Sequence, residues 1–176
     1  LERTGDHLGV PAPHRPRQRL WRIAARRAVL AAGALERPLV FGDNDRPGVM
    51  LAGAVRAYLN RYAVRPGERA VVFTDNDDGW STVAELRAAG VEVAAVIDPR
   101  EAPAVATRHA GVEHVRGVVT RALGFRALNG VAVRAGSGTR RIGCDLLAVS
   151  GGWTPTLHLT SHLGHAPRWD AARALF

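Results

Sequence analysis

The chain has 176 residues, 47% of them apolar, and a formal net charge of +8. That length is enough for one compact domain or two small interleaved lobes, and the single cysteine, Cys144, excludes an internal disulfide and a cysteine-rich metal site. No apolar run is long enough to cross a bilayer and no cleavable leader opens the sequence, so we expect a soluble, cytoplasmic protein without membrane contact.

The basic residues are all arginines, 24 in number, and acidic residues are scattered among them. The densest run, "HRPRQRLWRIAARR" at 14–27, alternates like a pair of strands and does not form an arginine face on a helix. Nucleic-acid binding needs a clustered basic footprint that neutralises phosphates. We therefore predict no nucleic-acid partner.

The first third of the chain begins with an irregular stretch, 1–18, that is rich in proline and histidine. Residues 19–33 are interpreted as two strands, of which the second, 27–32, is apolar enough to be buried on both faces and ends at Gly33. A loop punctuated by prolines follows at 34–48. Helical spacing then predicts a helix within 49–62, with one face formed by Met50, Val55, Leu59 and Tyr62.

The middle of the chain has the pattern of a βαβ unit. A strand at 70–74 precedes a helix at about 79–89, Gly90 ends that helix, and a second strand occupies 91–97. A further strand is expected near 113–120, and Asn129-Gly130 is a hairpin-turn signal. The predicted fold class is α/β, a Rossmann-like βαβ unit of the FAD/NAD(P)-binding type with a β-hairpin or meander.

The turn of this unit, "TDNDDG" at 74–79, replaces the glycines of a dinucleotide fingerprint with carboxylates. Glycines let the backbone approach a pyrophosphate and present helix amides to it, whereas Asp75, Asp77 and Asp78 have the wrong sign for phosphate. Gly79 remains, in the position used for helix packing. Asp98, where a ribose-binding acid would follow, is interpreted as a strand-end turn residue, and the sequence predicts a unit that has lost its ligand.

Metal and hydrolytic sites are not predicted. The three aspartates lack the rest of a calcium loop, and helix capping explains them better. His158 and His162 share a helix face without the glutamate of a zinc motif, so a surface role is preferred. Ser150 lacks the glycines of a nucleophile elbow.

Two apolar strands that end in small residues are the candidate cofactor-side turns. The first is "AVLAAGALERP" at 28–38 and the second is "CDLLAVSGGWTPT" at 144–156. They bracket the βαβ unit, as in flavoproteins with two dinucleotide-binding domains, where small residues let the backbone lie against a cofactor. The candidate binding residues are Ala31, Ala32, Gly33, Ala34, Gly151, Gly152 and Trp153.

With these segments, the chain resembles the alpha subunits of heterotetrameric sarcosine oxidases. The likeness covers about 17–170 and rests on "GALERPLVFGDNDRPGVMLAGAVRAYLNRY", "PGERAVVFTDND", "AAGVEVAAVID" and "CDLLAVSGGWTPTLHL". Where the family usually has Ala-Thr-Gly, this chain has Ala31-Ala32-Gly33 and lacks one hydroxyl. Related opine-oxidising and amine-oxidising flavoenzymes share the architecture, and they remain an alternative.

The resemblance implies a nucleotide-binding portion of an oxidoreductase that demethylates sarcosine to glycine, forms peroxide and passes a one-carbon unit to tetrahydrofolate. It implies NAD bound by the alpha subunit, FAD and FMN in the assembled complex, and partner beta, gamma and delta subunits. The phosphate-binding fingerprint and the folate site are expected outside this chain, which would then be inactive alone and contain no catalytic residue.

The implied domain plan has three parts. Residues 1–50 would be the end of a first dinucleotide-binding domain, 51–149 an inserted second domain, and 150–176 the return to the first. Glu36 and Arg37, beside the turn at Gly33, are the polar residues expected to position the dinucleotide, although a plain surface ion pair explains them equally well. A non-catalytic scaffold for subunit contact is the competing interpretation.

Overall fold

The computed structural model describes residues 1–101, 103, 111–162, 164–171 and 175–176. The chain divides into two units, Leu1–Ala31 and Ala32–Phe176. The first unit contains a short antiparallel pair, β1 (Glu2–Arg3) and β2 (Gln18–Arg19). Trp21 Nε1 donates to Glu2 at 2.9 Å and fastens the segment after β2 to this pair.

The predicted pair of strands at 19–33 is wrong. Only Arg19 belongs to a strand, and residues 27–32 are exposed and outside any strand. Val29, for example, is 93% exposed. A strand buried on both faces needs neighbours that pair with its backbone and layers that cover it, and residues 27–32 have neither among the described residues.

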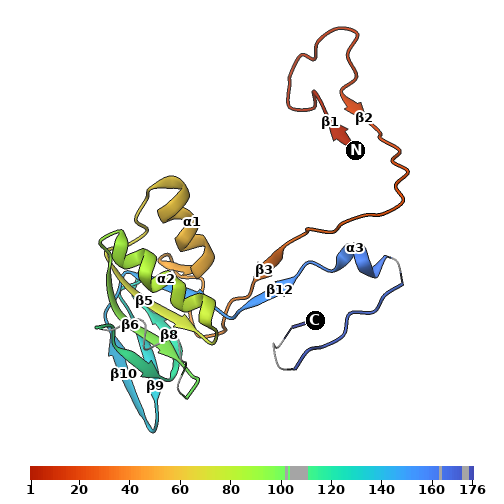
Figure 1. Cartoon of the computed structure of the whole chain (residues 1–176). Helices are drawn as coiled ribbons and strands as arrows, with labels where there is room; N and C mark the ends of the chain where they lie inside the picture. Colours follow the sequence, from red (N-terminus) through yellow and green to blue (C-terminus); the bar gives the residue numbers. More distant parts are fainter. Residues whose placement is uncertain (102, 104–110, 163, 172–174) are drawn as a thin grey trace. The chain divides into compact units, whose positions relative to one another are not determined.

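The second unit has three layers (Figure 1). Its centre is a parallel sheet in the order β4-β11-β5-β6-β7. Two helices pack on one face, and an antiparallel meander in the order β10-β9-β8 packs on the other. The elements are β4 (Val49–Leu51), α1 (Ala52–Tyr62), β5 (Arg69–Thr74), α2 (Asp77–Ala88), β6 (Glu92–Asp98), β7 (His114–Arg116), β8 (Val118–Leu123), β9 (Gly130–Ala135), β10 (Gly138–Ile142) and β11 (Leu146–Ser150).

Each face of the sheet has its own core because side chains alternate along the strands. Val72 and Val96 point to the helix side, where Trp80 and Leu86 of α2 are buried. Val71 and Phe73 point to the meander side, where Val131 and Val133 are buried. The α/β Rossmann-like fold is confirmed.

The βαβ unit β5-α2-β6 is confirmed at nearly its predicted bounds. Gly90 has a φ of +76° and its amide donates to Arg87 O, which ends α2 as expected. Asn76, and none of the three aspartates, is the N-cap, because its side chain accepts from Gly79 N at 3.1 Å. A Cβ on Gly79 would lie 2.1 Å from Thr74 Oγ1, so glycine is required where the helix meets the strand.

The meander corrects two further expectations. The predicted strand at 113–120 is two strands in different sheets, β7 in the parallel sheet and β8 in the meander. Asn129-Gly130 is not the central pair of a two-residue turn: the loop runs over 124–129, and Asn129 N donates to Leu123 O at 2.8 Å to close it. Gly130 already belongs to β9.

Beyond the sheet, β3 (Ala34–Glu36) pairs antiparallel with β12 (Trp153–Pro155), and α3 (His158–Ser161) follows. We call the β3 and β12 pair the ribbon. Because β3 precedes β4 and β12 follows β11, the ribbon places the entry to the sheet beside its exit. None of the described helices is long and apolar enough to cross a membrane.

Candidate cofactor-side site at the ribbon

The ribbon brings the two glycine-containing segments together, although Arg37 and Gly151 are 114 positions apart in the sequence. Arg37 N donates to Gly152 O at 2.8 Å and Gly151 N donates to Arg37 O at 2.7 Å. In β12, Trp153 lies opposite Glu36, and Pro155 lies opposite Ala34. The structure therefore gathers Ala34, Glu36, Arg37, Gly151, Gly152 and Trp153 in one place.

The two glycines are needed where the ribbon leaves the sheet. A Cβ on Gly151 would lie 3.0 Å from Arg37 O, and Gly152 has a φ of +82°, which favours glycine. Asn76 Nδ2 donates to Ser150 O at 3.1 Å and ties the end of β11 to the start of α2. The backbone of the second turn is thus close-packed against Arg37.

The Glu36 carboxylate lies at the N-terminus of α1, where Oε2 accepts from Gly53 N at 2.7 Å. A free helix amide and the helix dipole both favour a carboxylate in this position. Burial nevertheless raises the pKa of Glu36 above its usual value, and the Gly53 amide and the Ser150 hydroxyl only partly offset that effect. Glu36 Oε1 is buried and accepts no hydrogen bond from the described residues, so it is an available acceptor.

Trp153 connects the ribbon to the helix layer. Its indole Nε1 donates to Asp78 Oδ2 at 2.8 Å. Asp78 also pairs with Arg56 of α1 at 3.1 Å, and Arg56 pairs with Glu85 of α2 at 2.8 Å. Burial works to lower the pKa of Arg56, but Glu85 and Asp78 outweigh it and raise that pKa, so the guanidinium stays charged.

An open groove of about 570 Å³ lies along α1 beside this network. Its floor and walls are Gly53, Arg56, Ala57, Asn60, Arg61, Asp78 and Trp153. A cation, amide donors and an indole plane are groups that bind ribose, phosphate or a planar ring. The groove adjoins the Glu36 site through Gly53, which lines the groove and donates its amide to Glu36.

Three predicted residues lie outside this gathering. Ala31 belongs to the first unit, and Ala32 is exposed. Gly33 is next to the ribbon, where its carbonyl accepts from Thr156 N at 3.0 Å. Sequence reasoning missed Gly53 and Asp78 as contacts of Glu36 and Trp153, because contacts between distant segments have no local sequence signal.

The turn at β5 does not fit a dinucleotide. The Gly79 amide, which would face a phosphate, is taken by the Asn76 side chain at 3.1 Å. Asp98 is buried, accepts from Trp80 Nε1 at 2.8 Å and pairs with Arg100 at 2.8 Å. Arg100 also reaches Asp77 at 2.7 Å. Side chains of this chain therefore already bind the carboxylates that a ribose would need. Asp98 is a buried carboxylate with two partners, Trp80 and Arg100, and not a simple turn residue.

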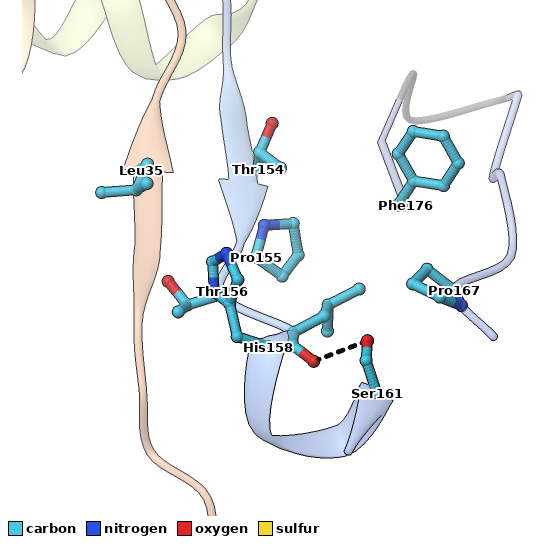
Figure 2. A pocket seen from close by; sticks show the side chains of 9 residues that line it. Leu35, Thr154, Pro155, Thr156, His158, Ser161, Pro167 and Phe176 are labelled. Atoms are coloured by element: carbon cyan, nitrogen blue, oxygen red, sulfur yellow. Dashed lines mark hydrogen bonds between the residues drawn. The ribbon is translucent and has the colours of Figure 1, made fainter. Parts of the chain in front are cut away.

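A second cavity, of about 440 Å³, adjoins the ribbon and is mostly apolar. Figure 2 shows Leu35 of β3 and Thr154 and Pro155 of β12 on one side, with Pro167 and Phe176 facing them. His158, one of the two histidines weighed as metal ligands, lines this cavity. Among the described residues, no three metal-ligating side chains are grouped so that they could hold a metal ion. Asp75, Asp77 and Asp78 therefore do not form such a group.

Comparison with known proteins identifies relatives along the whole chain. It is 49% identical over 176 residues to the sarcosine oxidase subunit alpha of Rhizobium meliloti (strain 1021), with all of this chain and 18% of the relative covered. It is 45% identical to the subunit alpha of Corynebacterium sp. (strain P-1), with 98% of this chain and 19% of that protein covered. The chain thus spans about a fifth of the length of these relatives, and no family model matches it.

Solved structures support the fold alone. L-proline dehydrogenase from P. horikoshii aligns with a TM-score of 0.63 at 22% identity, covering 83% of this chain and 25% of that one. An FAD-dependent pyridine nucleotide-disulphide oxidoreductase from Desulfovibrio vulgaris aligns with a TM-score of 0.55 at 17% identity, covering 83% and 43%.

Proposed function

The chain belongs to the family of sarcosine oxidase alpha subunits, and from that premise we propose that it is a nucleotide-binding portion of a flavoprotein oxidoreductase that demethylates sarcosine. The observation that carries the proposal is the 49% identity across the full chain. The proposed cofactors of the complex are NAD, FAD and FMN, with tetrahydrofolate as the one-carbon acceptor. The proposal keeps the beta, gamma and delta subunits as partners and the cytoplasm as the location.

The proposed role of this chain is to position NAD at the ribbon. Glu36 Oε1 is a buried acceptor without a partner among the described residues, which suits a ribose hydroxyl. Gly151 and Gly152 lie against the Arg37 carbonyl and guanidinium, so a side chain at either position would displace Arg37. At the helix terminus beside the ribbon, the Gly53 amide is already taken by Glu36, so in this proposal the chain supplies one wall and the rest of the subunit supplies the phosphate-binding loop.

The domain plan follows from the same ribbon. Entry and exit strands that pair with each other are what an inserted domain needs, and β3 and β12 do so. We therefore propose that 51–149 is an insertion between 1–50 and 150–176. The amine is oxidised on a flavin when one is bound, and the residues of this chain bind, orient and shield.

The test is the double variant Glu36→Ala/Arg37→Ala in the assembled full-length enzyme, with NAD content and sarcosine turnover measured separately. We expect NAD content to fall while the subunits still assemble. The matched control is Arg65→Ala/Glu68→Ala, an exposed pair 3.4 Å apart in the loop between α1 and β5, which should retain NAD. Loss of turnover with unchanged NAD content would contradict the proposal, because it would place the chemistry on this chain.

The scaffold interpretation applies to the βαβ unit alone. The observation that favours it is the occupation of the β5 turn by Asn76, Arg100 and Trp80. That unit supports the ribbon and offers surfaces to neighbouring parts of the complex.

A further inference from the structure

The stretch of the chain that includes the meander carries positive charge and no acidic residue. Residues 114–144 contain six arginines and neither aspartate nor glutamate, against a net charge of +8 for the whole chain. The arginines are Arg116, Arg121, Arg126, Arg134, Arg140 and Arg141. A single-sign segment of this kind creates a field that attracts acidic surfaces.

Strand register places three of these arginines on one face. Arg121 of β8 and Arg141 of β10 both lie opposite Ala132 of β9, and Arg134 is two residues further along β9. Val131 and Val133, which alternate with Ala132 and Arg134, are buried against the parallel sheet. Arg121, Arg134 and Arg141 therefore point away from the core, and all three are exposed. We call this surface the arginine face.

The arginine face is only partly neutralised within the chain. Arg121 pairs with Asp43 at 2.8 Å, whereas Arg141 donates to the neutral Asn129 at 2.9 Å. Arg134 and Arg141 have no carboxylate partner among the described residues. Arg121 and Arg141 lie two strand spacings apart, about 10 Å. That distance is close to the Debye length, so salt screens the repulsion between their charges only in part.

The helix layer provides the contrast. There, Arg56 is held by Asp78 and by Glu85, so its charge is balanced internally. In the meander, Arg121 and Arg140 have carboxylate partners, whereas Arg134 and Arg141 have none among the described residues. An opposing surface of negative charge would relieve the repulsion that the arginine face creates.

An exposed aromatic side chain lies at the end of the same meander. Phe125, in the loop between β8 and β9, is 91% exposed, and its carbonyl accepts from Arg46 at 3.0 Å, which fixes the loop backbone. An aromatic anchor next to arginines is the composition of a protein interface.

From these observations we propose that the arginine face, with Phe125 at its edge, docks against an acidic surface of a partner subunit. The inference rests on the proposed function only in that the related proteins are named as subunits. The choice of a protein over a nucleic acid follows from the small, partly apolar face: the half-buried Leu123 and Ala132 lie among the arginines. Electrostatic complementarity of this kind sets association rate and register.

The test is the charge reversal Arg134→Glu/Arg141→Glu in the full-length alpha subunit, with association to the purified partner subunits measured at 50 and 300 mM salt. We expect at least a tenfold loss of affinity at low salt, a smaller loss at high salt, and an intermediate loss for Arg134→Gln/Arg141→Gln. The control Arg65→Glu/Arg87→Glu makes the same charge change at two exposed arginines outside the meander, one just after α1 and one in α2, and it should weaken association less than twofold.

Each other outcome overturns the proposal. Unchanged association, or an equal loss in the control, would remove the arginine face from the interface. Normal association with a less stable alpha subunit would assign the face to a contact within that polypeptide, and loss of duplex DNA binding alone would assign it to nucleic acid. Because association is measured without turnover or NAD content, failure here leaves the proposed function unaffected, and failure of that function leaves this result standing.

Discussion

Trp80 and Asp98 are eighteen residues apart in sequence and are joined by a buried hydrogen bond of 2.8 Å from the indole Nε1 to Oδ2. The bond connects the first turn of α2 to the last residue of β6, across the position where a dinucleotide would lie in a βαβ unit. Arg100 completes the arrangement by donating to both Asp98 and Asp77. The closed turn is therefore held by specific partners, and each of them can be removed.

Replacing Arg100 with alanine leaves the Asp98 carboxylate buried without its positively charged partner. We expect local destabilisation of about 3 kcal/mol, the lower end of the range for breaking a buried pair, because Arg100 is itself partly exposed. Hydrogen exchange of the β6 amides measures it. Arg116→Ala is the control: its pair with Glu101 is exposed at 3.3 Å, and its loss should cost less than about 1 kcal/mol. Equal effects in the two variants would show that Asp98 does not depend on Arg100.

The same site sets a pH dependence. Burial opposes ionisation of Asp98, but hydrogen bonds from Arg100 and Trp80 outweigh it, so its pKa lies below the usual 3.8. A lowered pKa in the folded state stabilises the fold above the unfolded pKa, and that contribution is lost as the pH falls through the folded pKa. We expect wild-type β6 protection to be flat above about pH 5, whereas Arg100→Ala should begin to lose the ionised Asp98 at higher pH. Identical pH profiles would contradict this assignment.

Gly79 is expected to tolerate no side chain. A Cβ there would lie 2.1 Å from Thr74 Oγ1 and 2.5 Å from Thr74 Cβ, so even Thr74→Ala would leave a clash. Gly79→Ala should therefore destabilise the fold by about 2 to 3 kcal/mol, the cost of overpacking, in urea unfolding followed by circular dichroism. Adding Thr74→Gly should restore part of the loss. Gly138→Ala, where the nearest atom is 3.9 Å away, is the matched control and should change stability by less than about 1 kcal/mol.

How far sequence predicts this protein depends on the range of the interaction. The change from strand to helix periodicity around Gly79 and the stop at Gly90 are local, and the structure confirms the βαβ unit. Which polar group caps α2 is also local, but three aspartates beside Asn76 concealed the answer. The contacts of Asp98 with Trp80 and of Glu36 with Gly53 join distant segments, and no spacing in the sequence reveals them.

The segment 27–32 shows the opposite limit. Its apolar run favours a strand buried on both faces, yet a strand forms only where another backbone offers hydrogen bonds, and propensity carries no information about that partner. The sequence predicts the ribbon only in part. The sequence marks two glycine-containing turns, and the pairing of Glu36 with Trp153 follows from where β3 and β12 enter and leave the sheet.

Cys144 should be chemically inert in the folded chain. It is buried, and burial together with the nearby Asp145 carboxylate raises the pKa of its thiol to about 12. The thiolate is the reactive form, so we expect no labelling by iodoacetamide at pH 8 within the time that unfolded chain is fully labelled. Mass spectrometry with and without urea makes the comparison. Rapid labelling without urea would show that the strand end before β11 opens readily.

The chain alone is expected to bind NAD weakly, because the ribbon provides one wall of a site and no pyrophosphate-binding amides. An affinity of 1 μM corresponds to about −8 kcal/mol and needs a nearly complete set of contacts. Titration calorimetry of the 176-residue chain should therefore give a dissociation constant well above this value. Micromolar or tighter binding would mean that the groove along α1 or the turn at β5 binds the dinucleotide unaided.

Glu36→Gln separates the charge of Glu36 from its hydrogen bond. The amide oxygen of glutamine can still accept from Gly53 N, so the link between the ribbon and α1 is retained. Burial raises the pKa of Glu36 above 4.5, so the folded state favours the protonated form. The sign of the linkage follows: stability is greatest below the unfolded pKa and falls as the pH rises through the folded pKa. Glutamine removes that fall. In urea unfolding we expect the free energy of unfolding of the variant to equal that of the wild type at pH 4 and to exceed it slightly at pH 8.

In the assembled enzyme the Glu36→Gln variant should lose NAD, because an amide in place of a carboxylate is the weaker acceptor for a ribose hydroxyl. A variant that is less stable at pH 8 and retains its NAD would show that the Glu36 carboxylate serves the helix terminus and not the cofactor.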